Sequence, residues 1–295
     1  MNIYKYVILF FFITFCSTNE YYNEINTWKE QRLNALKAKD GYLNLAGLFH
    51  LDSGRYSLGS NEKNNFILPD DFPGNFANIT IKDSIISFSY LQDSILFNGS
   101  EYVMTKSYNV NIKTNKFSWK HFEWFLHREP GVFALRLRDL NHPMNNDYLH
   151  LDYFLTDPKW IVNAKYYPYD SVKVRKSINV LGNIFEETVP GILRFIINND
   201  SFLLEPTQTK TNKFFIVFSD FTSSNETYSG GRFIYTLLPN ENRDVIIDFN
   251  KSYNPPCVFS SFTTCPLPPS INQLKLRIEA GEKMYKGLSY SSIYE

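Results

Sequence analysis

The chain has 295 residues, and its hydrophobic fraction of 43% and aromatic fraction of 17% exclude a disordered protein. Its 30 basic residues are matched by 30 acidic ones, which excludes the strong electrostatic attraction that nucleic-acid binding needs. A chain of this length forms one large or two medium domains, and we expect two.

The N-terminus predicts export. One cation, Lys5, precedes an apolar run from Val7 to Phe15 that is too short to span a membrane, which is the layout of a secretory signal; the alternative is a buried core helix. Ile13-Thr14-Phe15-Cys16 resembles the bacterial lipobox, although a small residue usually stands where this chain has Phe15. We therefore expect a signal peptide over 1–15 and a lipid on Cys16. This would anchor the protein to a membrane of the cell envelope, on its periplasmic or extracellular face, and a freely secreted protein is the alternative.

The segment after Cys16 carries the best helical pattern of the chain. Between Ser17 and Lys39 apolar residues recur on one face, Ser17-x-x-Glu20 forms a possible capping box, and Asp40-Gly41 ends the pattern. The lipidated N-terminus and this helix together predict a helical stalk over 16–40.

Strand patterns dominate from residue 41 onward. Apolar and polar positions alternate in 132–138, which is typical of a strand with one wet face, and Asn-Gly and Pro-Gly pairs separate short runs as they do in hairpins. We expect strands at 66–68, 78–81, 85–90, 122–126, 132–138, 177–180, 193–197, 201–204, 213–218, 232–235 and 244–249. Turn residues at 141–143 predict the boundary between a first β domain over 41–140 and a second, antiparallel one over 141–283, with a tail over 284–295.

Several motifs resemble the uncharacterised bacterial and archaeal family DUF1684. The sharpest are Glu226-Thr-Tyr-Ser-Gly-Gly-Arg-Phe-Ile-Tyr235 and Asp248-Phe-Asn-Lys-Ser-Tyr-Asn-Pro-Pro-Cys257, which are supported by the runs 41–49, 58–61, 66–69, 264–269 and 279–283. The resemblance extends over roughly 28–283 and implies no established activity.

Part of the first half is also similar to the forkhead-associated (FHA) β-sandwich, on Gly59-Ser60 and Phe97-Asn98-Gly99. The phosphothreonine readers of that fold have an arginine where this chain has Ser60, and a serine and a histidine where it has Pro73 and Phe76. Because phosphate recognition needs charge-assisted donors, we expect an FHA-like scaffold without that activity. The predicted fold is thus mainly β, an FHA-like β-sandwich followed by a second antiparallel β domain, with a short N-terminal helix.

No common catalytic motif is present, and the five histidines, at 50, 121, 127, 142 and 150, show no metal-ligand spacing. We therefore expect no metal and no cofactor. With Cys16 assigned to the lipid, an exported Cys257 and Cys265 predict a disulfide. A metal or reactive-thiol site and two unpaired thiols are the alternatives.

Polar side chains are dense in one segment, from Asp248 to Cys265. The candidates for ligand binding there are Asp248, Asn250, Tyr253 and Asn254, beside a proline pair that would preorganise the loop. The alternative is architectural, with Asn and Asp capping a tight turn. Glu226 and Arg232 are further candidates, and Asp220 is a weaker one.

Two functions follow from these candidates. The first is a binding or scaffolding protein at the cell envelope, whose partner is an unknown small molecule or an envelope protein. The alternative is a hydrolase-type enzyme with a polar site around Arg232, Asp248, Tyr253 and Cys257, in which Asp248 or Glu226 is the base and Arg232 holds an anion. Convergence of these groups in one cleft would favour the enzyme.

Overall fold

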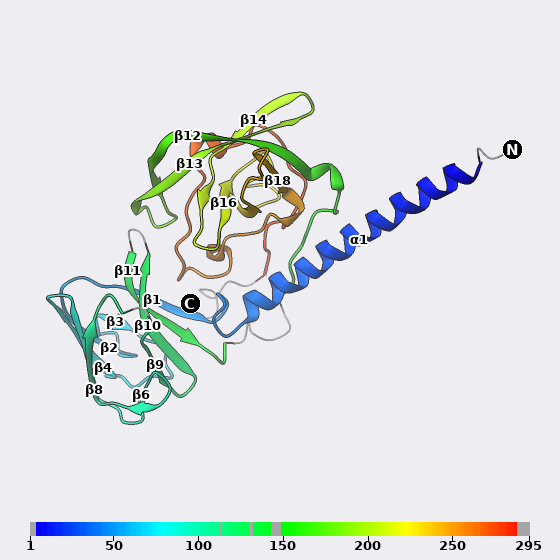
Figure 1. Ribbon diagram of the computed structural model, residues 1–295. Coiled ribbons are helices and arrows are strands. Elements are labelled where there is room, and N and C mark those ends of the chain that lie inside the picture. The colour runs from blue at the N-terminus through cyan, green and yellow to red at the C-terminus, as the bar shows by residue number, and fades with distance from the viewer. Residues whose placement is uncertain (1–3, 113, 130–131, 143–148, 288–295) are drawn as a thin grey trace.

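The computed structural model describes residues 4–112, 114–129, 132–142 and 149–287, with side chains from Asn19 onward. The fold is mainly β, as predicted: within the described residues one long helix, α1, precedes the strands β1–β18, which form four sheets (Figure 1). The predicted tail over 284–295 lies mostly outside the described residues, and so does the side chain of Cys16.

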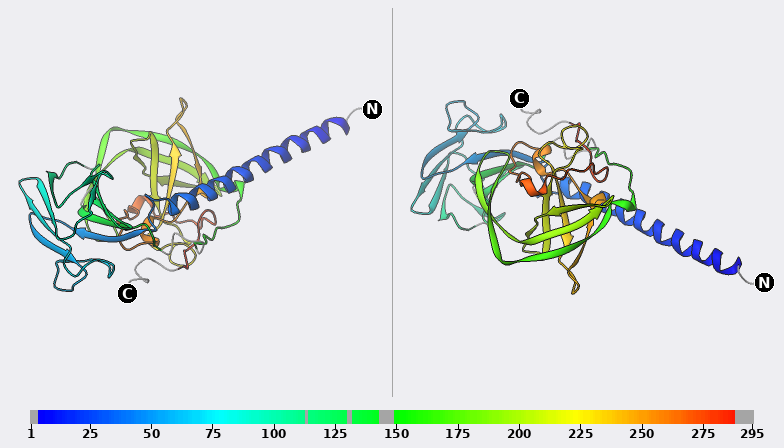
Figure 2. Two further views of the ribbon diagram at one scale, coloured as in Figure 1. Left: turned by 90° about the horizontal axis from the view of Figure 1, so that it is seen from below. Right: turned by 90° about the horizontal axis from the view of Figure 1, so that it is seen from above.

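Helix α1 (Tyr4–Lys37) is longer than the predicted helix, because it also includes the apolar run before Cys16. Its N-terminal half extends away from the β units, whereas its C-terminal half lies against them (Figures 1 and 2). It ends where Gly41 N–H donates to the carbonyl of Ala38. Nowhere in the described part of the chain does a helix combine the length and the apolar character that crossing a bilayer requires.

The first unit is a sandwich of two sheets. One sheet has the order β1-β11-β10-β9-β6-β7 and the other β3-β2-β4-β5-β8, and aromatic side chains from both, such as Phe88 and Phe117, form its core. The strand bounds are β1 (Leu45–His50), β2 (Gly54–Gly59), β3 (Phe66–Ile67), β4 (Ala77–Lys82), β5 (Ile85–Tyr90), β6 (Leu96–Phe97), β7 (Glu101–Tyr102), β8 (Thr105–Asn109), β9 (Lys116–Trp119), β10 (Phe122–Glu129) and β11 (Val132–Asp139).

The second unit has sheets of order β14-β13-β12-β18 and β15-β16-β17, which enclose a separate core around Phe195, Phe218 and Phe249. The strand bounds are β12 (Ile161–Ile178), β13 (Ile184–Ile197), β14 (Asp200–Leu204), β15 (Thr207–Gln208), β16 (Lys213–Phe218), β17 (Arg232–Leu237) and β18 (Asp244–Asp248). Short 3-10 turns lie at η2 (Pro158–Trp160), η3 (Phe249–Lys251), η4 (Pro256–Val258) and η5 (Ser270–Asn272).

Helix α1 packs on this second unit through the segment that follows β18. The hydroxyl of Tyr21 donates to Asp248 Oδ1 at 3.0 Å, and Lys251 Nζ lies 2.5 Å from Glu24 Oε1. Ile25, which follows Glu24 on the helix, is fully buried. The N-terminal segment and the loop after β18, far apart in sequence, therefore meet at one place.

Candidate functional site

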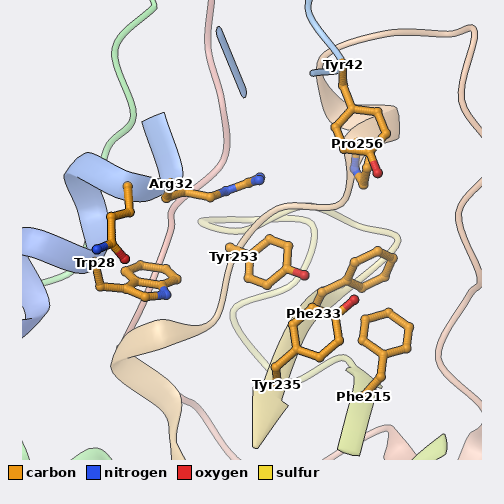
Figure 3. Close-up of a pocket in the computed structure, with 9 residues that line it drawn as sticks. Trp28, Arg32, Tyr42, Phe215, Phe233, Tyr235, Tyr253 and Pro256 are labelled. Carbon is orange, nitrogen blue, oxygen red and sulfur yellow. The ribbon is translucent and has the colours of Figure 1, made fainter. Parts of the chain in front are cut away.

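A pocket of about 340 Å³ lies where α1, the chain just before β1, and the second unit come together (Figure 3). Its volume is at the lower end of the range for small-molecule sites. Six of the nine lining side chains are aromatic, and the lining consists of Trp28, Gln31, Arg32, Tyr42, Phe215, Phe233, Tyr235, Tyr253 and Pro256.

Phe215, Phe233, Tyr235 and Tyr253 form the aromatic floor of the pocket. They gather there because successive side chains of a strand point to opposite faces of its sheet. In β16 and β17 the even-numbered side chains belong to the core, whereas Phe215 and Tyr235 pair across the strands on the opposite face, with ring centroids 5.0 Å apart. Phe233 and Tyr253 exchange two backbone hydrogen bonds of 2.9 Å, which adds Tyr253 to this sheet edge. The Tyr253 ring lies 6.3 Å from that of Tyr235 at an interplanar angle of 22°. The result is a continuous aromatic surface beneath α1.

Arg32 supplies the charge of the pocket. Its Nε donates to Glu282 Oε1 at 3.0 Å, its Nη2 donates to the carbonyl of Asn254 at 2.9 Å, and its guanidinium lies 4.5 Å from the ring centroid of Tyr253. Glu282 is fully buried and does not line the pocket, and its carboxylate neutralises the charge of Arg32. No described residue provides a hydrogen-bond partner for the remaining nitrogen, Nη1, and none of the nine lining side chains is acidic.

The three lining tyrosines are hydrogen-bond donors at neutral pH. Burial raises the pKa of Tyr42 and of Tyr235, and it raises the pKa of Tyr253 well above the usual value. Their hydroxyls therefore stay protonated, and together with Arg32 they make the polar part of the lining mainly donating.

Among the residues predicted from sequence, only Tyr253 lines this pocket. Asp248 accepts from Tyr21 and caps the N–H of Asn250, whose side-chain amide donates to the carbonyl of Asp157 at 2.9 Å. The side-chain amide of Asn254 donates to the carbonyl of Lys283 at 2.7 Å. These groups hold the loop together and dock α1, which corresponds to the architectural alternative for this segment.

Arg232 and Glu226 lie elsewhere. Arg232 is fully buried, with Nη2 3.2 Å from Asp220 Oδ1 and further hydrogen bonds to the carbonyls of Ile278 and Ala280. Glu226 forms an ion pair with Arg277 near the surface. None of these hydrogen bonds of Arg232 joins it to Asp248, beside which the hydrolase alternative would need it.

The predicted disulfide is wrong for this structure, because Cys257 and Cys265 are free thiols. They are neighbours, but Cys265 Sγ accepts a 3.2 Å hydrogen bond from the backbone N–H of Cys257 instead of forming a covalent bond. Hydrogen bonding from the Cys265 thiol lowers the pKa of Cys257, whereas burial raises that of Cys265. Within the described chain no group of three or more His, Cys, Asp or Glu side chains is placed to hold a metal ion.

Sequence reasoning missed eight of the nine lining residues. Trp28 and Arg32 are four residues apart on α1, so they lie on one side of the helix, in a segment that the sequence predicts to be a stalk. Phe233 and Tyr235 lie inside a recognised motif, where their alternation was the available signal.

Comparison with known proteins finds a family similarity within the second unit. Residues 146–283 match DUF1684, a protein of unknown function. The match includes the predicted motifs at 226–235 and 248–257, whereas the resemblance over 41–69 lies outside it. An uncharacterised protein of Haloarcula marismortui, solved by NMR in solution, shares 25% sequence identity over 48% of this chain and 80% of its own, with a TM-score of 0.40. No curated protein matches, and nothing in these comparisons confirms the FHA likeness.

The pocket straddles the border of the DUF1684 region. Five lining residues fall inside 146–283, from the sheet and the loop after β18, and the other four come from α1 and from Tyr42. The DUF1684 region therefore supplies the aromatic floor, and the N-terminal segment supplies the opposite wall with its cation.

Proposed function

We propose that this chain is a binding protein that holds a small molecule between α1 and the aromatic surface of the DUF1684 region. The observation that carries the proposal is the pocket itself: six aromatic side chains and one guanidinium enclose about 340 Å³. Ligand sites in proteins are usually concave, largely apolar and furnished with a few fixed polar groups.

Binding is favoured over catalysis by the chemistry of the lining. A hydrolase needs a nucleophile or a general base, and none of the nine lining side chains is a carboxylate, a histidine, a cysteine or a serine. The tyrosine hydroxyls have raised pKa values, which makes them poor nucleophiles at neutral pH.

Calorimetric titration with 2-naphthol and 2-naphthoate tests this function. Wild-type protein should bind at least one of the two, and Tyr235→Ala should weaken that binding, because the substitution removes a ring from the pocket floor. Tyr235 is 47% exposed, so the fold should tolerate the change. Tyr102→Ala removes an exposed tyrosine, 71% accessible, from β7 in the other unit and should bind as wild type does. Absence of binding by wild type, or equal binding by Tyr235→Ala, would refute the proposal.

We also propose that the protein acts at the cell envelope, exported and lipid-anchored through Cys16. The support is the sequence alone: Lys5, the short apolar run and the lipobox-like Ile13-Thr14-Phe15-Cys16. Cys16→Ser should move the protein from the membrane to the soluble fraction and abolish metabolic labelling with palmitate. If wild-type protein takes up no label, the anchor does not exist.

A further inference from the structure

We infer that the pocket selects a planar aromatic carboxylate, whose ring stacks on the aromatic floor and whose anion binds Arg32. This inference rests on the proposed binding function and specifies its ligand class.

The floor of the pocket suits a flat ring. The rings of Tyr235 and Tyr253 are nearly parallel, and Phe215 lies 34° from Tyr235, so these three rings have similar orientations. Phe233 stands at 81° to Phe215 and 85° to Tyr253 and packs edge-on against them. Trp28 and Tyr42 stand on the opposite sides of the opening (Figure 3). A planar aromatic ligand can stack in an offset manner on such faces and bury most of its apolar surface.

Arg32 decides the charge of the ligand. An aromatic box without a cation would suit a quaternary ammonium group, because the ring faces are negative. Here the guanidinium of Arg32 already lies over Tyr253 and would repel a second cation. It extends across the pocket toward Tyr42, with no partner for Nη1 among the residues that the structure describes (Figure 3).

Glu282, the buried partner of Arg32, determines how strongly the pocket prefers a carboxylate over a neutral ligand. Glu282 accepts from Arg32 Nε through Oε1 and from the backbone N–H of Asn254 through Oε2 at 2.8 Å, so both carboxylate oxygens are engaged behind the pocket wall. Because the Arg32–Glu282 pair is neutral overall, a ligand anion gains short-range hydrogen bonds to Nη1 and to tyrosine hydroxyls and little long-range attraction. Charge-assisted hydrogen bonds of this kind correspond to a preference of about ten- to a hundredfold over a neutral analogue.

The test compares 2-naphthoate with its neutral isostere 2-naphthamide by calorimetric titration. Wild type should bind the carboxylate about ten- to a hundredfold more tightly than the amide. Arg32→Lys should remove most of this preference, because an ammonium can still pair with Glu282 but presents no second planar N–H edge to the ligand.

A second variant avoids disturbing the buried pair. Gln31→Glu places a negative charge in the lining without changing Arg32 or Glu282, and it should weaken carboxylate binding more than amide binding. Asn34→Glu adds the same charge to an exposed position of α1 that does not line the pocket, and it should leave the preference intact.

The outcomes separate the inference from the function. Equal affinity of wild type for the carboxylate and the amide, or tighter binding of the cation 2-naphthylmethylammonium, would overturn the ligand class and leave the pocket as a binding site. Failure of all three compounds to bind would overturn the binding function and the inference with it.

Discussion

The buried pair of Arg232 and Asp220 should contribute strongly to the stability of the second unit. Arg232 donates to Asp220 and to the carbonyls of Ile278 and Ala280, and both charged side chains are almost completely buried. Arg232→Met keeps an apolar chain of similar reach but leaves the Asp220 carboxylate without its cation. The carbonyl of Ile278 loses its donor, and the carbonyl of Ala280 keeps only the Ser252 hydroxyl at 3.4 Å. Asp220 would keep its hydrogen bonds from Thr222 and from the N–H of Ile278, which is not enough to compensate a buried charge. We expect a loss of about 3–5 kcal/mol in the free energy of unfolding.

Differential scanning calorimetry measures this loss in the transition of the second unit. At about 2–4 °C per kcal/mol, Arg232→Met should lower that transition by roughly 6–20 °C. The double variant Arg232→Met/Asp220→Asn should recover part of the shift, because the stranded charge is removed. Arg277→Met makes the same chemical change at an exposed ion pair and should leave the transition nearly unchanged. A shift for Arg232→Met as small as that of Arg277→Met would refute the reasoning.

Four further outcomes are expected. Burial lowers the pKa of His142 from 6.5 to about 4, so on acidification the unfolded chain binds a proton before the folded chain does. The free energy of unfolding should therefore fall between pH 6.5 and about 4, by up to about 1.4 kcal/mol per pH unit. A His142→Gln variant whose free energy of unfolding falls equally steeply with pH would contradict this. In unfolded, unreduced protein Cys257 and Cys265 should both react with iodoacetamide, and in folded protein Cys257 should react first and at lower pH than an ordinary thiol. Both cysteines lie in the tryptic peptide 252–275, and recovery of this peptide unalkylated and lighter by two hydrogens would exclude free thiols. Asn254→Ala leaves the carbonyl of Lys283 without its donor and should destabilise by about 1–3 kcal/mol in calorimetry, so an unchanged transition would show that the bond contributes nothing. Because α1 forms one wall of the pocket, 2-naphthoate at about a hundred times its Kd should slow hydrogen exchange in residues 19–37. The free energy of opening measured by this exchange should rise by up to about 2.7 kcal/mol. Unchanged exchange would mean that binding and helix docking are independent.

Most strands could be predicted because their side chains alternate between core and solvent. Every predicted strand overlaps an observed one, since the repeat of two is a local property that burial on one face imposes. Strand β12 is the main exception in extent: it begins at Ile161, whereas the prediction began at Ser177. Its middle portion is largely exposed, so burial on one face does not mark it, and pairing with β13 and β18 makes the segment a strand.

The site was harder to predict because its residues are distant in sequence. The density of polar groups after β18 predicted Tyr253 as a site residue, and Tyr253 lines the pocket. The same density also predicted Asp248, Asn250 and Asn254, which do not line the pocket and whose hydrogen bonds hold the loop and α1. The sequence predicted Arg232 as a candidate for binding an anion. It does not reveal that the guanidinium is fully buried against Asp220.

The sequence by itself determined the mainly-β class, the position of most strands and the DUF1684 motifs, because these depend on local alternation and on short runs of residues. Only the tertiary structure decided which groups face the pocket. Arg32 and Tyr253 are more than two hundred residues apart and meet because α1 packs on the loop after β18. That contact includes polar bonds between distant segments, and such bonds leave no periodic pattern in the sequence.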